Sequence, residues 1–185
     1  MESFRDLPPE LPVPEDDGGA DHLRGAELPP ITLPATSGEG VSLADAAAAT
    51  LVLYVYPRTG VPGQPLPEGW DEIPGARGCT PQNCAFRDLH SELRALGATV
   101  HGMSAQPLDE LREFAAREQI PFPLLNDGEF RLAGQLGLPT FEAGGMRLYK
   151  RLTLIARGGT IDEVIYPVFP PGSDAAKAVG LLSSS

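Results

Sequence analysis

Apolar and polar residues are arranged along the chain in a pattern that predicts strands and helices in turn. Residues 51–56, with the sequence LVLYVY, form a continuous apolar run that ends at Pro57, which is typical of a strand buried on both faces of a sheet. The stretches on either side of Arg157-Gly158-Gly159 predict a hairpin. The other strands are predicted at residues 31–33, 99–104, 122–125, 148–156 and 160–168.

Apolar residues at helical spacing predict the helices that alternate with these strands. The first helix follows Cys79 and ends at Gly97, where glycine favours a helix stop. Its apolar face consists of Phe86, Leu89, Leu93 and Leu96. The other helices are predicted near residues 108–114, 130–136 and 174–182. This order of elements predicts an α/β domain with a mixed central sheet flanked by helices.

Two segments show no apolar periodicity. Residues 1–25 are rich in proline, glycine and acidic residues, which predicts a flexible tail ahead of a domain that spans residues 26–185. Residues 58–78 lie between a predicted strand and a predicted helix and contain several prolines and glycines. This composition predicts an ordered surface loop inserted in the domain.

The charge balance and the N-terminus limit the classes of partner. The net charge of −11 argues against nucleic acid or an anionic membrane as the main partner. No apolar run reaches the roughly 18–20 residues that span a bilayer. The first residues, MESFRDLPPELPVPEDD, lack the basic and apolar regions of a secretory signal. We therefore expect a cytoplasmic protein, in which two nearby cysteines are redox-active or catalytic more often than structural.

The only two cysteines, Cys79 and Cys84, lie close together where a helix is predicted to begin. Thr80 and Pro81 fit the N-cap and the first helical position. Because the N–H groups at a helix N-terminus stabilise a negative charge, we expect Cys79 to react as a thiolate. Cys84 lies inside the first turns, beside Phe86, where we expect an ordinary buried thiol.

The spacing of the two cysteines restricts what they can do together. Residues five positions apart on an ideal helix are separated by ~7.5 Å of rise, whereas a disulfide needs Cα atoms within roughly 4.4–6.8 Å. A disulfide between Cys79 and Cys84 therefore requires the first turns of the helix to unwind. This predicts a centre with two states, in which a sulfenic acid on Cys79 condenses with Cys84.

Spacing and placement alone leave a second interpretation open, in which both cysteines are small buried residues that only pack. A zinc site is disfavoured, because His22, His90 and His101 are scattered and show no usual ligand spacing with the cysteines. We therefore expect no metal.

The residues from about 27 to 182 resemble the peroxiredoxins, specifically the PrxQ or bacterioferritin-comigratory-protein type. The resemblance depends on a strand that ends in Tyr-Pro, a Gly-Cys-Thr motif with a second cysteine, and a later strand with an arginine. The matching residues are Tyr56-Pro57, Gly78-Cys79-Thr80, Cys84, Arg87-Asp88, Gly102-Met103-Ser104 and Tyr149-Lys150-Arg151.

This resemblance implies a thioredoxin-like fold and a peroxidase that reduces hydrogen peroxide and organic hydroperoxides. Cys79 matches the peroxidatic cysteine and Cys84 the resolving cysteine on the same helix. Arg151 matches the arginine that holds the thiolate and polarises the peroxide, and Gln82 the residue that braces this arginine. The resemblance also implies recycling by thioredoxin or a similar dithiol, with no metal or prosthetic group.

The chain departs from the family pattern just before the reactive cysteine. Ala76 and Glu72 stand where the family has a hydroxyl residue and a proline. This leaves open which group besides Gly78 and Thr80 binds the peroxide. Thr59 follows Tyr56-Pro57 closely, and we hypothesise that it reaches the site if the inserted loop folds back.

Two other functions remain as alternatives. One is a peroxide-sensing switch, in which the Cys79–Cys84 disulfide unfolds the helix locally and changes a binding surface. The other is a thiol–disulfide oxidoreductase acting on proteins, which the four-residue spacing disfavours. No C-terminal extension carries a third cysteine for an intersubunit disulfide, and we therefore expect a monomer.

Overall fold

The central sheet of the computed structural model, which describes residues 4–184, has the strand order β5-β4-β3-β8-β9. The middle strand, β3 (Thr50–Val55), is parallel to β4 (Ala98–Ser104), and β4 is parallel to β5 (Leu124–Asn126). On its other side, β3 is antiparallel to β8 (Leu152–Arg157), which pairs with β9 (Thr160–Ile165). The prediction of an α/β fold with a mixed sheet is confirmed.

The two faces of β3 belong to different parts of the hydrophobic core. Leu51, Leu53 and Val55 point into one cluster of buried side chains, and Val52 and Tyr54 point into another. Because both faces of β3 are covered by other parts of the core, its sequence needs no alternation of apolar and polar residues. This explains the continuous apolar run that the sequence shows here.

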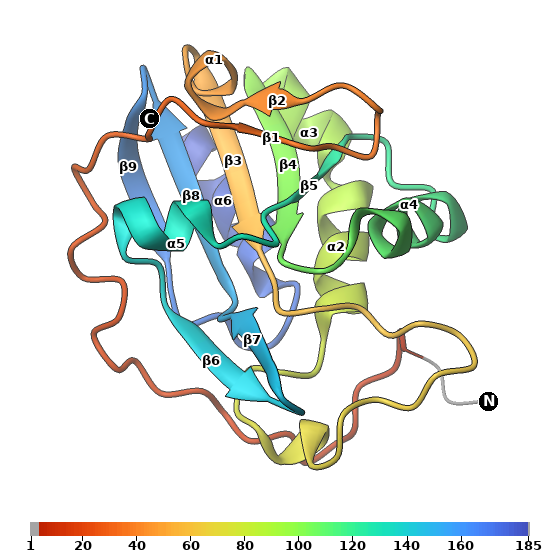
Figure 1. The fold of residues 1–185 in the computed structure, drawn as a ribbon. Helices are drawn as coiled ribbons and strands as arrows, with labels where there is room; N and C mark the ends of the chain where they lie inside the picture. Colours follow the sequence, from red (N-terminus) through yellow and green to blue (C-terminus); the bar gives the residue numbers. More distant parts are fainter. Residues whose placement is uncertain (1–3, 185) are drawn as a thin grey trace.

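Helices cover both faces of the sheet (Figure 1). One face packs against helices whose buried side chains include Phe86, Leu93, Phe114 and Leu182. These helices are α2 (Cys79–Asp88), α3 (His90–Ala95), α4 (Leu108–Arg117) and α6 (Ser173–Ser183). The opposite face is covered by α1 (Leu43–Ala46) and α5 (Arg131–Leu136). None of the helices formed by the described residues is long and apolar enough to cross a membrane.

Several boundaries differ from those predicted. The helix after Cys79 is divided at Leu89 into α2 and α3. The strand predicted over residues 148–156 is also divided, because its first part, β7 (Met146–Tyr149), pairs with β6 (Thr140–Ala143) in a separate sheet. The spacing of apolar residues cannot predict this break, because it does not show which strand each part pairs with. A second small sheet joins β1 (Thr32–Leu33) and β2 (Val41–Ser42).

The structure corrects the prediction of a flexible tail over residues 1–25. Residues 1–3 lie outside the described part, but residues 4–25 run along the molecule without forming a helix or strand, from the loop before α2 to the edge of the sheet (Figure 1). Leu23 is fully buried in the core, and Asp17 accepts hydrogen bonds from Lys150 Nζ and the Tyr166 hydroxyl at 2.7 Å each. Composition indicated disorder because most residues of the segment are proline, glycine or acidic. The few residues that anchor it do so by contacts with distant parts of the chain, which composition does not show.

Residues 58–78 connect β3 to α2 as a loop with one short 3₁₀ helix, η1 (Trp70–Glu72). Trp70 is buried and packs in a small apolar cluster with Ala76 and Leu148. The loop therefore has its own anchor, close to the start of α2.

Candidate active site

Cys79 is the first residue of α2 and is only 3% exposed. Gly78 precedes it as the N-cap, with the left-handed φ of 119°. A Cβ at Gly78 would lie 2.3 Å from a side-chain carbon of Pro171, so that glycine is needed for space as well as for backbone conformation. Thr80, which we predicted to be the N-cap, lies instead in the first turn, because the backbone of Gly78 already begins the helix.

The sulfur of Cys79 lies beside a buried guanidinium. Arg151 occupies the break between β7 and β8, is 4% exposed, and places Nη2 3.3 Å from Cys79 Sγ. The same nitrogen donates to the carbonyl oxygens of Gly75 at 3.2 Å and Ala76 at 3.1 Å. The guanidinium is always charged and is held in place by these carbonyls, so that a fixed positive charge lies beside the sulfur.

Gln82 braces Arg151 from the first turn of α2. Its Oε1 accepts a hydrogen bond of 2.6 Å from Arg151 Nη1. Its Nε2 donates to Asp174 Oδ2 at 2.6 Å, and the Thr153 hydroxyl donates to the same oxygen at 2.8 Å. Asp174 is fully buried at the start of α6, and this burial raises the pKa of its carboxyl group. A chain of hydrogen bonds thus joins α6 to the arginine.

Sequence reasoning missed Asp174 and Thr153. Each is an ordinary residue in its local context, one near the start of a helix and the other inside a strand. Their involvement depends on the packing of α6 against α2, and no local pattern reports that packing.

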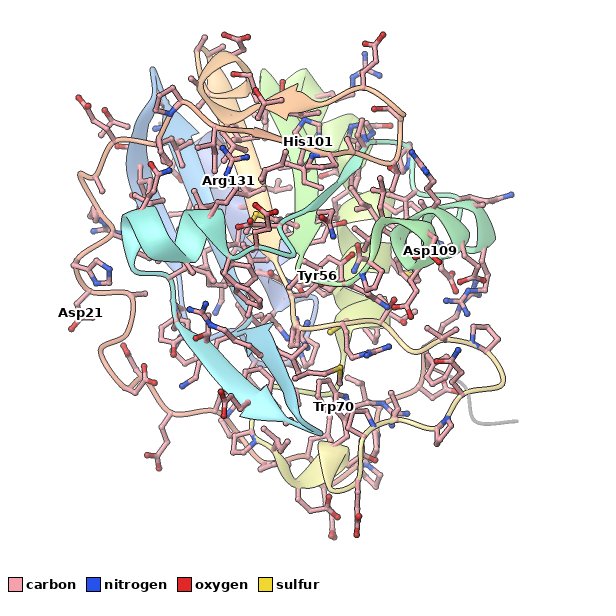
Figure 2. All side chains as sticks on the ribbon, viewed as in Figure 1. Asp21, Tyr56, Trp70, His101, Asp109 and Arg131 are labelled. Atoms are coloured by element: carbon pink, nitrogen blue, oxygen red, sulfur yellow. The ribbon has the colours of Figure 1, made fainter. Side chains whose placement is uncertain are left out.

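A second set of contacts ties the first turn of α2 to the sheet. The Tyr54 hydroxyl donates to Asn83 Oδ1 at 2.5 Å, and Asn83 Nδ2 donates to the carbonyl oxygen of Cys79 at 2.8 Å. Tyr56, at the end of β3 (labelled in Figure 2), lies in the same core cluster as Cys79, and its hydroxyl has no hydrogen-bond partner among residues 4–184. Burial raises the pKa of Tyr56, which keeps it a neutral phenol.

Cys84 lies on the same continuous helix and is half-buried, whereas we expected an ordinary buried thiol. Its sulfur is 3.7 Å from Glu118 Oε2, at the C-terminal end of α4. Burial raises the pKa of the Cys84 thiol, and the Glu118 carboxylate raises it further. Arg87 Nη1 lies 3.6 Å from the same carboxylate oxygen. Both cysteines are free thiols in this structure.

A small cavity of about 10 Å³ lies in front of Cys79. Gly78 and Thr80, both predicted to bind substrate, line it. Trp70, labelled in Figure 2, lines it from the inserted loop, and Arg58 and Arg77 add two cationic side chains that sequence reasoning missed.

Thr59 does not line this cavity, although its neighbours Arg58 and Gly60 do. Its hydroxyl and its backbone N–H both donate to Gln106 Oε1, at 3.1 and 3.0 Å. The loop folds back toward Cys79 as hypothesised, but the structure directs the Thr59 hydroxyl to Gln106.

At Ala76, where the family pattern has a hydroxyl, the backbone carbonyl contacts the site instead. Among residues 4–184, no group of three or more histidine, cysteine or acidic side chains is arranged to hold a metal ion. The site therefore contains the Cys79 sulfur, hydrogen-bond donors beside it, and a small cavity in front of it.

A helix N-terminus and a neighbouring guanidinium are surroundings that activate a cysteine sulfur as a nucleophile. The fold and site therefore define the class of thiol-based redox enzymes. The redoxin family model matches residues 23–182. The chain belongs to this family and, within it, to the peroxiredoxin Q/Bcp type, an oxidoreductase group of thiol peroxidases.

Similar proteins support this assignment. Chloroplastic peroxiredoxin Q from Triticum aestivum is 33% identical over 161 residues, which cover 87% of this chain and 67% of the relative. The putative peroxiredoxin bcp of Coxiella burnetii is 29% identical over 161 residues, covering 85% and 97%. The crystal structure of peroxidoxin BcpB from Mycobacterium tuberculosis superposes with a TM-score of 0.70 at 26% identity, covering 87% of this chain and 96% of that one.

Proposed function

We propose that this protein reduces hydrogen peroxide and organic hydroperoxides through a sulfenic acid on Cys79 and a disulfide between Cys79 and Cys84. The observation that carries the proposal is the 3.3 Å contact between Arg151 Nη2 and Cys79 Sγ at the start of α2. No other cysteine of the chain lies beside a guanidinium at a helix N-terminus.

In the first step, the Cys79 thiolate attacks one peroxide oxygen, and the O–O bond breaks. The sulfur is oxidised to the sulfenic acid, and the leaving oxygen takes a proton to become water or an alcohol. Negative charge moves from the sulfur to the leaving oxygen, and the fixed donors of Arg151 and the helix N-terminus stabilise it at both ends. Gln82 acts as a positioning residue for Arg151.

Gly78 and Thr80 are proposed to bind the peroxide, because they line the cavity with Cys79. For Thr59 we propose a supporting role, in which its hydrogen bonds to Gln106 hold the loop that carries Arg58 and Gly60. A Thr59→Val variant with unchanged peroxidase rate would remove Thr59 from the site altogether.

In the second step, the Cys84 sulfur attacks the sulfenic sulfur and water leaves. Because both cysteines lie on one helix, the first turns of α2 must unwind before the sulfur atoms can meet. A dithiol protein such as thioredoxin is then proposed to reduce the disulfide. We further propose that the protein acts as a monomer in the cytoplasm, where such reductants keep cysteines as thiols.

The test uses two variants and stopped-flow mixing with peroxide. Reduced wild-type protein is expected to consume hydrogen peroxide rapidly, and Cys79→Ser is expected to lose this reaction. Cys84→Ser is expected to accumulate a sulfenic acid on Cys79, visible by mass spectrometry, and to turn over poorly with thioredoxin. Unchanged consumption in Cys79→Ser would overturn the proposal.

The alternative function, a peroxide-sensing switch, is favoured by the ion pair that Arg5 forms with Glu118, at 2.6 Å, beside Cys84. Disulfide formation would disturb this pair and with it the N-terminal segment. Negligible turnover with thioredoxin, together with partner binding that changes on oxidation, would favour the switch over the peroxidase.

A further inference from the structure

The N-terminal residues Phe4 to Leu7 lie over both cysteines. Phe4 lines the cavity in front of Cys79. Its ring packs against the backbone of Gly60, where an added methyl group would lie 2.3–2.5 Å from three ring carbons. Leu7 lies near the helix cap, since its Cδ2 would lie 3.5 Å from a Cβ added at Gly78. The segment lies beside the inserted loop in Figure 1.

Arg5 fastens this segment to α4. Its Nη2 lies 2.6 Å from Glu118 Oε2 and its Nε lies 3.3 Å from Glu118 Oε1, a two-point contact between guanidinium and carboxylate. The Glu118 side chain is only 7% exposed, so that water screens its end of the pair poorly. Arg77 adds a longer contact of 3.5 Å to the carbonyl oxygen of Asp6.

The space that remains under Phe4 is very small. A cavity of about 10 Å³ holds roughly one water molecule. Hydrogen peroxide is little larger than water, and a small adjustment of the Phe4 ring admits it. A hydroperoxide with a bulky organic group requires the ring to leave its place on Gly60.

We propose that residues 4–7 form a lid over Cys79, in which Phe4 is a specificity-determining residue that favours hydrogen peroxide over bulky organic hydroperoxides, and Arg5 is the positioning residue that holds it. This inference rests on the proposed peroxidase function and adds a substrate preference to it. Large hydroperoxides react only in the fraction of molecules whose lid is open.

The test compares the second-order rate constants for oxidation of Cys79 by hydrogen peroxide and by cumene hydroperoxide. Trp70, the single tryptophan, lines the same cavity, so its fluorescence is suited to follow the reaction. In Phe4→Ala, the ratio of the cumene to the hydrogen peroxide rate constant is expected to rise about tenfold. Val13→Ala is the matched control, because Val13 is exposed in the N-terminal residues 4–25 and does not line this cavity. It is expected to leave the ratio unchanged.

Two further variants move the ring without changing it. Gly60→Ala places a methyl group where the ring lies, and Arg5→Ala removes the ion pair with Glu118. Both are expected to raise the ratio of the cumene hydroperoxide to the hydrogen peroxide rate constant. Arg5→Lys is expected to raise it less than Arg5→Ala, because lysine keeps the charge but cannot make the two-point contact with Glu118. These variants also carry the test if Phe4→Ala does not fold.

The possible results separate the lid from the proposed function. A wild-type chain that reacts with neither hydroperoxide removes the proposed function and the lid with it. Normal wild-type rates, with both rate constants unchanged in Phe4→Ala and Gly60→Ala, overturn the lid alone. A rise of both rate constants by the same factor in these variants overturns the proposed substrate preference, because the ratio stays unchanged.

Discussion

Cys79 and Arg151 are separated by 72 residues in the chain and by 3.3 Å in the fold. The helix N-terminus and the guanidinium meet at the same sulfur, and both are features that attract negative charge. Sequence reasoning identified both residues and Gln82, the first from its place at a helix start and the other two through the family resemblance. It missed Asp174, Arg77 and Phe4, which reach the site only through contacts between distant segments.

The contribution of Arg151 is measurable by substitution. Arg151→Gln is expected to slow the oxidation of Cys79 by hydrogen peroxide by about 10²–10³-fold, because a fixed donor to the developing charge is lost. The oxidation rate of Arg151→Lys is expected to lie between those of the wild type and Arg151→Gln. Lysine keeps the charge but cannot contact Gln82, Ala76 and Cys79 together. Arg157→Gln, an arginine paired with Asp162 at the end of β8, serves as the control in stopped-flow measurements. Equal rates in Arg151→Gln and Arg157→Gln would contradict the assigned role.

Asp174 makes stability depend on pH. Burial raises its pKa above the ordinary value of 3.8, so the folded protein binds this proton more tightly than the unfolded chain. The associated stability is present below 3.8 and is lost as the pH rises through the folded-state pKa. Asp174→Asn removes this titration. The free energy of unfolding of the variant minus that of the wild type is therefore expected to increase with pH.

Urea titrations between about pH 4 and pH 7 measure this difference, and the other carboxylates cancel from it because both proteins share them. A difference that stays constant over this range would show that the Asp174 carboxyl titrates normally in the folded protein.

At the scale of elements, the proposed disulfide requires α2 to be both stable and able to unwind. Its continuous form keeps the two cysteines apart, while the Tyr54–Asn83 pair holds its first turn through the carbonyl oxygen of Cys79. The sequence predicted the helix and the separation of the cysteines from periodicity and ideal geometry. It did not predict the division at Leu89 or the anchoring by Asn83, which depend on α3 and β3.

Asn83→Ala is expected to favour unwinding. The loss of a buried hydrogen bond costs about 1 kcal/mol, which corresponds to a factor of about five in the equilibrium between folded and unwound turns. Disulfide formation after oxidation is therefore expected to be several-fold faster, with a lower melting temperature. Rapid quenching and mass spectrometry follow the disulfide, and Ser91→Ala, at an exposed position of α3, is the control. A slower disulfide step in Asn83→Ala would contradict the anchoring role.

At the scale of the whole molecule, the N-terminal segment is part of the fold. Leu23 is fully buried in the core cluster that also contains Leu132 of α5, and Asp17 bonds to Lys150 and Tyr166. Composition predicted flexibility here because it averages over many exposed residues, whereas the stability of the segment comes from a few buried ones.

Leu23→Ala is expected to lower the free energy of unfolding by about 2–5 kcal/mol, the usual cost of a cavity in a core. Val13→Ala, at a position in the same segment that is 61% exposed, is expected to change it by less than about 0.5 kcal/mol. Urea unfolding measures both. A small loss in Leu23→Ala would mean that the segment detaches at little cost, as expected of a flexible tail.

The sequence by itself determined the order of strands and helices, the place of Cys79 at a helix start and the separation of the two cysteines along that helix. These are local properties, set by periodicity, turn residues and helix geometry. Only the tertiary structure decided how distant segments meet at the site. Arg151, implied by the family resemblance, contacts the sulfur from the break between two strands. Asp174 of the last helix bonds to Gln82, and Phe4 of the N-terminal segment lines the cavity beside Cys79. Such contacts depend on how the whole chain packs, and residue spacing does not record them.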